Sequence, residues 1–206
     1  MNNEELPPHD FPPGATKERP KKKPNGELPP EMAVPVGETA FSLLERDLPP
    51  VVRLCDPWAT EGVNIIAGRP KLGKTTLERQ KMAAAATASS FLDSTFPIAV
   101  RCAFLSLEEG DRLCVHKFTK AGLSEQALSG IQLFFEWGRG AEGVHMLDLY
   151  LEKNPDVKLV CIDSLTKFRT VPDPRTPSFM ADYEAVSGLH DMIKRHPGCC
   201  LDIIHH

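Results

Sequence analysis

Val63-Asn64-Ile65-Ile66-Ala67-Gly68-Arg69-Pro70-Lys71-Leu72-Gly73-Lys74-Thr75 is the stretch that decides the fold of this chain. Its last eight residues fit the pattern G-x-x-x-x-G-K-[ST], in which a glycine-rich loop holds phosphate. The apolar run before the loop predicts a β-strand, and the segment from Thr75 to about Ala88 predicts a helix. The glycines allow a tight turn whose backbone N–H groups face one anion, and the helix dipole adds to their field. The stretch therefore predicts a nucleoside triphosphate site.

Two side chains at the end of this loop have specific expected roles. Lys74 should reach the β- and γ-phosphates, and the Thr75 hydroxyl should be a ligand of Mg²⁺. A chance match to a loose pattern is the alternative, and the flanking strand and helix argue against it. The residues expected to contact the nucleotide are Gly68, Arg69, Pro70, Lys71, Leu72, Gly73, Lys74, Thr75 and Thr76.

A second motif is the apolar run 157–162 with Asp163 directly after it. So continuous an apolar run is typical of a parallel strand buried on both faces, whose carboxyl end faces the ligand crevice. Asp163 is therefore expected beside the phosphate loop, where its carboxylate can help to hold Mg²⁺. The alternative is an ordinary strand followed by an aspartate that caps a turn.

Hydrolysis also needs a group that orients or deprotonates water. Glu108 is the candidate, because it ends the apolar strand 101–107 and should also point into the crevice. Glu109 is the alternative base. Both residues could instead be first-turn and capping residues of the helix expected at about 111–121.

These motifs, with Trp137-Gly138-Arg139-Gly140 and Ile203-Ile204-His205-His206, resemble RecA-like ATPases over about residues 48–206. The nearest subgroup is the AAA-family ATPases of phages and plasmids, which are similar to hexameric replicative helicases. The resemblance implies a RecA-like P-loop NTPase of the α/β class, with a parallel five-stranded sheet flanked by helices. It also implies ATP and Mg²⁺ as cofactors and Glu108 as the base, with Lys74 and Asp163 as its catalytic companions. The γ-phosphate sensor maps to His205 or His206.

The same resemblance implies partners. Such helicases carry an arginine or lysine finger just beyond the fifth strand, worth about 10³ to 10⁵ in rate, and this chain ends at His206. We therefore expect a homo-oligomer such as a hexamer-like ring, or a partner ATPase chain that supplies the finger. The expected function is a helicase-like motor in DNA replication or maintenance of a mobile element. The alternative is a truncated, non-catalytic nucleotide-binding module.

Composition divides the chain into two parts. Residues 1–37 are predicted to be a disordered arm, because they contain nine of the 19 prolines, three consecutive lysines and few large apolar residues. Residues 38–206 are predicted to be the ATPase domain. If the arginine or lysine finger belongs to a longer form of this domain, residues 38–206 are a C-terminally truncated version of it. The net charge of −4 argues against a strongly basic nucleic-acid surface. Single-stranded DNA is still a candidate partner through Lys167, Arg169 and Arg175. The alternative is that these three residues belong to a solvated loop that contacts no nucleic acid.

The remaining patterns complete the prediction. Helices are expected at 38–47, 142–153 and 178–195, and strands at 131–135 and 199–204. The last helix should bury Phe179, Tyr183, Val186, Leu189 and Ile193. The six cysteines have no zinc-like spacing, and most lie in apolar runs, which favours free buried thiols. Without a membrane span or signal peptide in the sequence, we expect a cytoplasmic protein.

Overall fold

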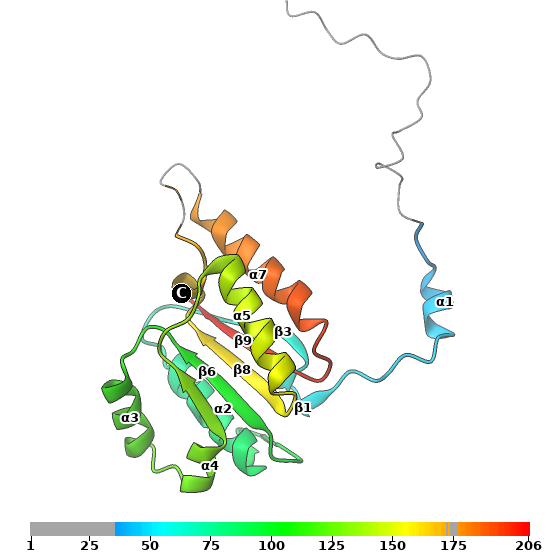
Figure 1. The fold of residues 1–206 in the computed structure, drawn as a ribbon. Helices are drawn as coiled ribbons and strands as arrows, with labels where there is room; N and C mark the ends of the chain where they lie inside the picture. The colour runs from blue at the N-terminus through cyan, green and yellow to red at the C-terminus, as the bar shows by residue number, and fades with distance from the viewer. Residues whose placement is uncertain (1–35, 172, 174–176) are drawn as a thin grey trace, which may run out of the picture. The chain divides into compact units, whose positions relative to one another are not determined.

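The computed structural model describes residues 36–171, 173 and 177–206. Its centre is a five-stranded sheet in which every neighbouring pair of strands is parallel (Figure 1). The spatial order is β3-β9-β8-β6-β7. The strands span Gly62–Ala67 (β3), Arg101–Ser106 (β6), Ile131–Phe134 (β7), Val157–Asp163 (β8) and Cys200–His205 (β9). The predicted α/β fold with a parallel five-stranded sheet is confirmed.

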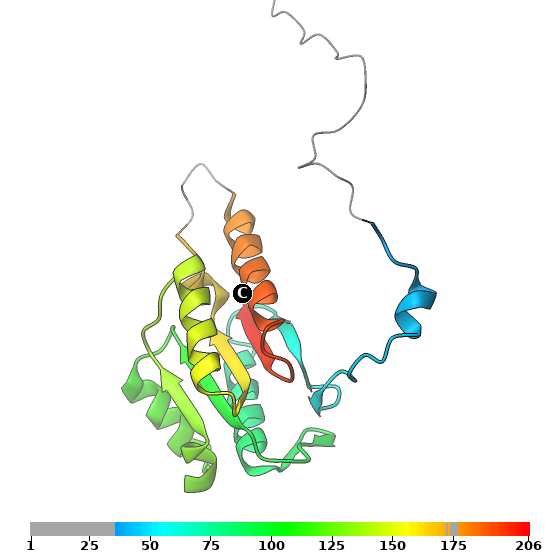
Figure 2. The same cartoon turned by 45° about the vertical axis from the view of Figure 1, so that its right-hand side comes forward.

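Helices cover both faces of the sheet, as the views in Figures 1 and 2 show. On one face lies α2 (Lys74–Thr87), and on the other α5 (Gly140–Lys153) and α7 (Ser178–Ile193) pack side by side. The alternation of side chains along each strand divides the core accordingly. In β6, Phe104 belongs to the cluster on the α2 face, and Leu105 belongs to the cluster beneath α5 and α7. Burial on both faces explains why these strands are continuously apolar.

Several short elements were not predicted from the sequence. Within the described residues, two small antiparallel hairpins and two short helices lie around the sheet beyond the expected elements, and one of the hairpins contains the partners of Trp58. The Trp58 ring meets Phe91 edge to face, and its Nε1 donates to Asp93 Oδ1 at 2.7 Å. Trp58 therefore packs against a hairpin. The additional elements are β1 (Arg53–Cys55), β2 (Ala59–Thr60), β4 (Ser90–Phe91), β5 (Ser94–Thr95), α4 (Glu125–Ser129) and α6 (Leu165–Phe168). The helix expected at about 111–121 is present as α3 (Asp111–Lys120).

The predicted buried face of α7 is partly wrong. Leu189 and Ile193 are buried as predicted, but Phe179 and Tyr183 are 67% and 74% exposed, and Ala181 and Ala185 are buried instead. The helix packs closely on α5 and the sheet through small residues, and these carry a weaker hydrophobic signal in the sequence than the aromatic residues do. Two aromatic residues of the predicted face are thus left at the surface.

The chain divides into two compact units, residues 1–48 and 49–206. In the described part of the first unit, the helix expected at 38–47 is shorter, Ala40–Leu44 (α1), and Thr39 caps it by accepting from the Ser42 N–H. Of the predicted arm, only residues 36 and 37 are described, so that assignment stays a prediction. All six cysteines are free and buried. Across the described residues, we find no helix with the length and apolarity needed to cross a bilayer.

Candidate functional site

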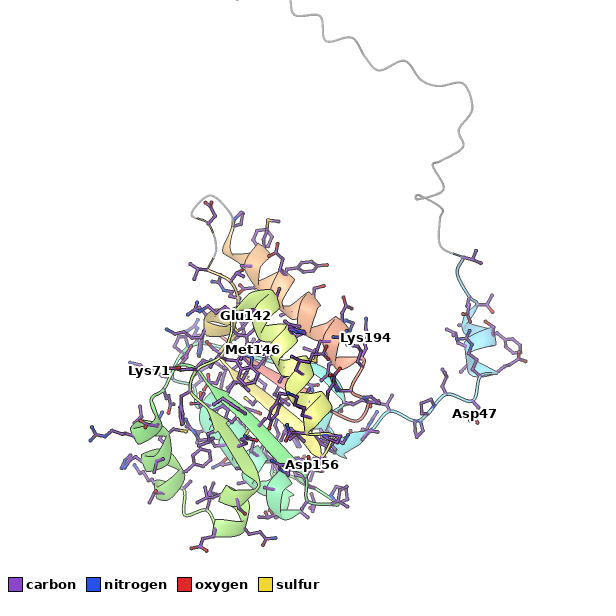
Figure 3. All side chains as sticks on the ribbon, viewed as in Figure 1. Asp47, Lys71, Glu142, Met146, Asp156 and Lys194 are labelled. Carbon is purple, nitrogen blue, oxygen red and sulfur yellow. The ribbon has the colours of Figure 1, made fainter. Side chains whose placement is uncertain are left out.

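The glycine-rich loop connects β3 to α2 at the carboxyl end of the sheet. In Figure 3, Lys71 of this loop lies at the end of the sheet opposite Asp156, which precedes β8. Gly73 has φ of +89° at the helix N-cap, a conformation that favours glycine. This N-cap makes no side-chain hydrogen bond to the helix. The first N–H groups of α2 are thus without a side-chain cap, as a phosphate-binding helix start requires.

The Lys74 side chain lies across this loop. Its Nζ donates to the carbonyl oxygens of Gly68 at 2.7 Å and Arg69 at 3.0 Å, and the residue is only 9% exposed. The loop backbone therefore holds the ammonium group in place. This position puts a positive charge where the loop would hold phosphate oxygens.

Asp163 ends β8 next to the start of α2. It is 2% exposed, and its Oδ1 has no hydrogen-bond partner among the described residues. Burial raises the pKa of Asp163, and the neighbouring Thr75 hydroxyl opposes that rise. Side-chain ligand atoms of Asp163, Glu108 and His206 lie within 4.8 Å of one another. A buried, unpartnered carboxylate oxygen beside a hydroxyl is the oxygen donor set that Mg²⁺ prefers, so Thr75 and Asp163 fit this ion.

The two consecutive glutamates have different surroundings. Glu108, whose side chain is 34% exposed, faces the site: its Oε1 accepts from the Ser164 hydroxyl, and its Oε2 lies 3.5 Å from His206 Nε2. Glu109 is bound by Arg79 at 2.8 Å and by Lys117. Burial raises the pKa of Glu109, but the hydrogen bonds from these two cations outweigh it and hold the pKa below its usual range. The geometry therefore favours Glu108 over Glu109 as the base.

The fifth strand of the sheet brings two histidines to the same site. β9 lies between β3 and β8, and His205 is in register with Ala67, the last residue of β3. The His205 ring is partly exposed, and its Nδ1 has no partner among the described residues. His206 contacts Glu108. Both candidates for γ-phosphate sensing thus lie near the loop.

Sequence analysis missed the residues that support these groups. Ser164 follows Asp163 without a motif of its own, and Arg79 lies 5.7 Å from the ring centroids of both Phe104 and Phe118.

Beneath α2, Lys81 pairs with Glu78 at 2.8 Å and with Asp202 of β9 at 2.6 Å, and all three residues are buried. The spacing of Glu78 and Lys81 in the helix was a detectable signal. The contribution of Asp202, 121 positions after Lys81, was not.

A cavity of about 350 Å³ opens between α2 and α3, and it reaches Thr76 in the first turn of α2. Most of its exposed lining is apolar, and two of the three cationic side chains in its wall, Arg79 and Lys117, are paired with Glu109. Neither helix predicted it, because it forms only where the two helices meet. Its lining is Thr76, Arg79, Gln80, Lys117, Lys120, Ala121 and Leu123.

The three residues predicted to contact single-stranded DNA differ in their surroundings, and the structure describes two of them. Lys167 is exposed on α6. Arg169 is engaged in an ion pair with Asp182 at 2.8 Å, and its side chain is 12% exposed. Arg175 lies outside the described residues. Of the two predicted contacts that the structure describes, Lys167 is thus the exposed one.

Comparison with known proteins extends this description. A protein-family model described as "AAA domain" matches residues 29–206. No curated protein matches the chain. Among solved structures, the RadB recombinase aligns with a TM-score of 0.49 and 19% sequence identity, over 71% of this chain and 62% of that one. The chain therefore spans less than two thirds of the recombinase.

Proposed function

Because the chain belongs to the AAA domain family, we propose that it binds ATP with Mg²⁺ and hydrolyses the γ-phosphate. The observation that carries the proposal is the convergence of three groups at the carboxyl end of one sheet. Lys74 lies over the phosphate loop, the buried carboxylate of Asp163 lies beside Thr75, and Glu108 faces the same space. These are the parts that phosphoryl transfer to water needs.

Binding of the triphosphate is assigned to the loop and to α2. The N–H groups at the start of α2 and the Lys74 ammonium stabilise the phosphate charge. Thr75 and Asp163 would hold Mg²⁺, which neutralises charge on the phosphate oxygens when bound. The largely apolar cavity between α2 and α3 is our candidate for the nucleoside, since Thr76 belongs both to the predicted phosphate-contacting set and to the cavity wall.

Glu108 is assigned as the base that accepts a proton from the attacking water. Its carboxylate reaches the site and is partly exposed, while the Ser164 hydroxyl holds one of its oxygens. Glu109 instead ties α2 to α3 through Arg79 and Lys117, which leaves both of its oxygens occupied by cations. His205 is assigned as the sensor of the γ-phosphate because its buried Nδ1 has no partner within the described residues.

For work on a substrate, we propose a helicase-like motor that acts on single-stranded DNA, in replication or in maintenance of a mobile element. Lys167 is its candidate strand contact. The finger that completes catalysis would come from a neighbouring subunit of a ring, or from a partner ATPase chain. Loss of the γ-phosphate would then change contacts at the subunit boundary and move the DNA-binding loop.

ATP turnover by the purified chain, measured over a protein concentration series with and without single-stranded DNA, tests this proposal. Turnover per chain should rise with protein concentration and with DNA. Glu108→Gln should keep ATP binding and lower turnover by a factor on the order of 10² to 10⁴, whereas the matched variant Glu109→Gln should retain turnover. Tight binding without turnover under every condition would instead identify a non-catalytic nucleotide-binding module.

A further inference from the structure

Three neighbouring strands each bring one potential metal ligand to the carboxyl end of the sheet. β8 lies between β6 and β9, as Figure 1 shows, and Asp163 is its last residue. Glu108 comes shortly after β6, and His206 comes directly after β9. Side-chain ligand atoms of these three residues all lie within 4.8 Å of one another. The order of the strands therefore gathers two carboxylates and one imidazole at one point.

The ligand atoms of Glu108 and His206 have the spacing of two groups that share one ion. Glu108 Oε2 and His206 Nε2 are 3.5 Å apart, which is longer than the roughly 2.7–3.2 Å of a hydrogen bond between nitrogen and oxygen. Two ligands of one tetrahedral zinc ion, each about 2.0–2.1 Å from the metal, lie roughly 3.4 Å from each other. The Ser164 hydroxyl donates to the other oxygen of Glu108, Oε1, and thereby fixes the orientation of the carboxylate. Outer hydrogen bonds of this kind support metal ligands in proteins.

Asp163 provides a second, independent indication of a ligand. The residue is 2% exposed, and its Oδ1 is buried without a hydrogen-bond partner among the described residues. A charged oxygen that is buried without a partner carries a large cost in free energy. The carboxylate of Glu108 adds a second negative charge close by, and repulsion between like charges increases that cost. A divalent cation held by both carboxylates offsets both contributions.

We propose that Glu108, Asp163 and His206 form a Zn²⁺ site whose occupation blocks ATP hydrolysis. An imidazole nitrogen favours zinc over Mg²⁺, which prefers oxygen ligands. Three protein ligands leave the fourth position of a tetrahedral zinc ion open to water. The proposed Mg²⁺ site pairs Asp163 with Thr75 instead, so the two metal sites share one carboxylate and cannot both be filled.

The blockade follows from which groups zinc would occupy. Zinc takes Glu108, the proposed base, so this carboxylate no longer accepts a proton from water. It also takes Asp163 away from Mg²⁺. The blockade rests on the proposed hydrolysis of ATP, whereas zinc binding depends only on the three side chains and needs no nucleotide.

Isothermal titration calorimetry of Zn²⁺ into nucleotide-free protein tests the site. Wild-type protein should bind one zinc ion per chain, and excess Mg²⁺ should leave that binding in place. His206→Ala should raise the zinc dissociation constant at least about tenfold, since even loss of a residue that only supports a ligand costs about 10–100-fold. His190→Ala is the matched control: this histidine is exposed on α7, so the variant should keep the wild-type zinc affinity. Circular dichroism checks that both variants are folded.

ATP turnover with Mg²⁺ and increasing free Zn²⁺ tests the blockade. Zinc should lower the turnover of the wild type, and His206→Ala should need at least about tenfold more free zinc for the same fractional loss. Zinc binding by a chain that never turns ATP over would support the site and refute the proposed hydrolysis, so the two failures can be told apart. The absence of zinc binding at neutral pH, a zinc affinity that His206→Ala leaves unchanged, an equal loss in His190→Ala, displacement of zinc by Mg²⁺, or turnover that bound zinc does not lower would each overturn the proposal.

Discussion

Substitution of Glu78 by glutamine should change how the stability of the protein depends on pH. Glu78 is fully buried with Lys81 and Asp202, so two carboxyl groups share one ammonium group out of contact with water. Burial, and then the charge of Asp202, raise the pKa of Glu78 from 4.5 to about 8. At neutral pH the folded protein therefore keeps a proton that the unfolded chain releases.

The sign and the size of the effect follow from that proton. Because the folded state binds more protons than the unfolded state between about pH 4.5 and 8, the free energy of unfolding falls as pH rises through this range. The slope is about 1.4 kcal/mol per pH unit, so roughly 4 kcal/mol is the largest loss between pH 5 and 8. Glu78→Gln is neutral in both states and removes this contribution.

Urea unfolding of the wild type and of Glu78→Gln at intervals from pH 5 to 8, followed by circular dichroism, measures the difference. The two proteins should have similar stability at pH 5, and the variant should be the more stable one at pH 8. The comparison between the two proteins cancels the contributions of groups that do not interact with Glu78, such as Asp163, whose pKa is also raised. Parallel pH profiles for the two proteins would refute a protonated Glu78.

Three further outcomes are expected. Lys74→Ala should abolish ATP binding, measured with a fluorescent nucleotide, because it removes the charge held over the loop; retained affinity would argue against the phosphate site. Glu109→Gln should lower the melting temperature through loss of two ion pairs, a stability effect that Glu108→Gln, measured by the same thermal melt, should lack. Gly143→Ala should be destabilised by about 1–3 kcal/mol through overpacking, because a Cβ there would lie 2.3 Å from Gly138 O; an unchanged urea midpoint would show that the backbone adapts.

Local patterns were sufficient for much of the fold. The glycine loop with its flanking strand and helix, and the apolar run that ends at Asp163, are each contiguous in sequence. The physical reasons for them are also local: backbone conformation at glycine, strand burial and helix periodicity. For α7 the same reasoning predicted the helix and the burial of Leu189 and Ile193, but not that small residues would replace two aromatic ones on the buried face. Phe179 and Tyr183 are exposed, whereas Ala181 and Ala185 are buried.

The sequence by itself determined which groups are available for nucleotide chemistry: a loop lysine, a threonine, two carboxylates after strands and a terminal histidine pair. Only the tertiary structure decided how they meet. The insertion of β9 between β3 and β8 puts His205 near the loop, and ion pairs of Glu109 with two helices leave Glu108 facing the site. Strand order and ion-pair partners join residues far apart in the chain, and their choice depends on the packing of the whole core, which no local pattern encodes.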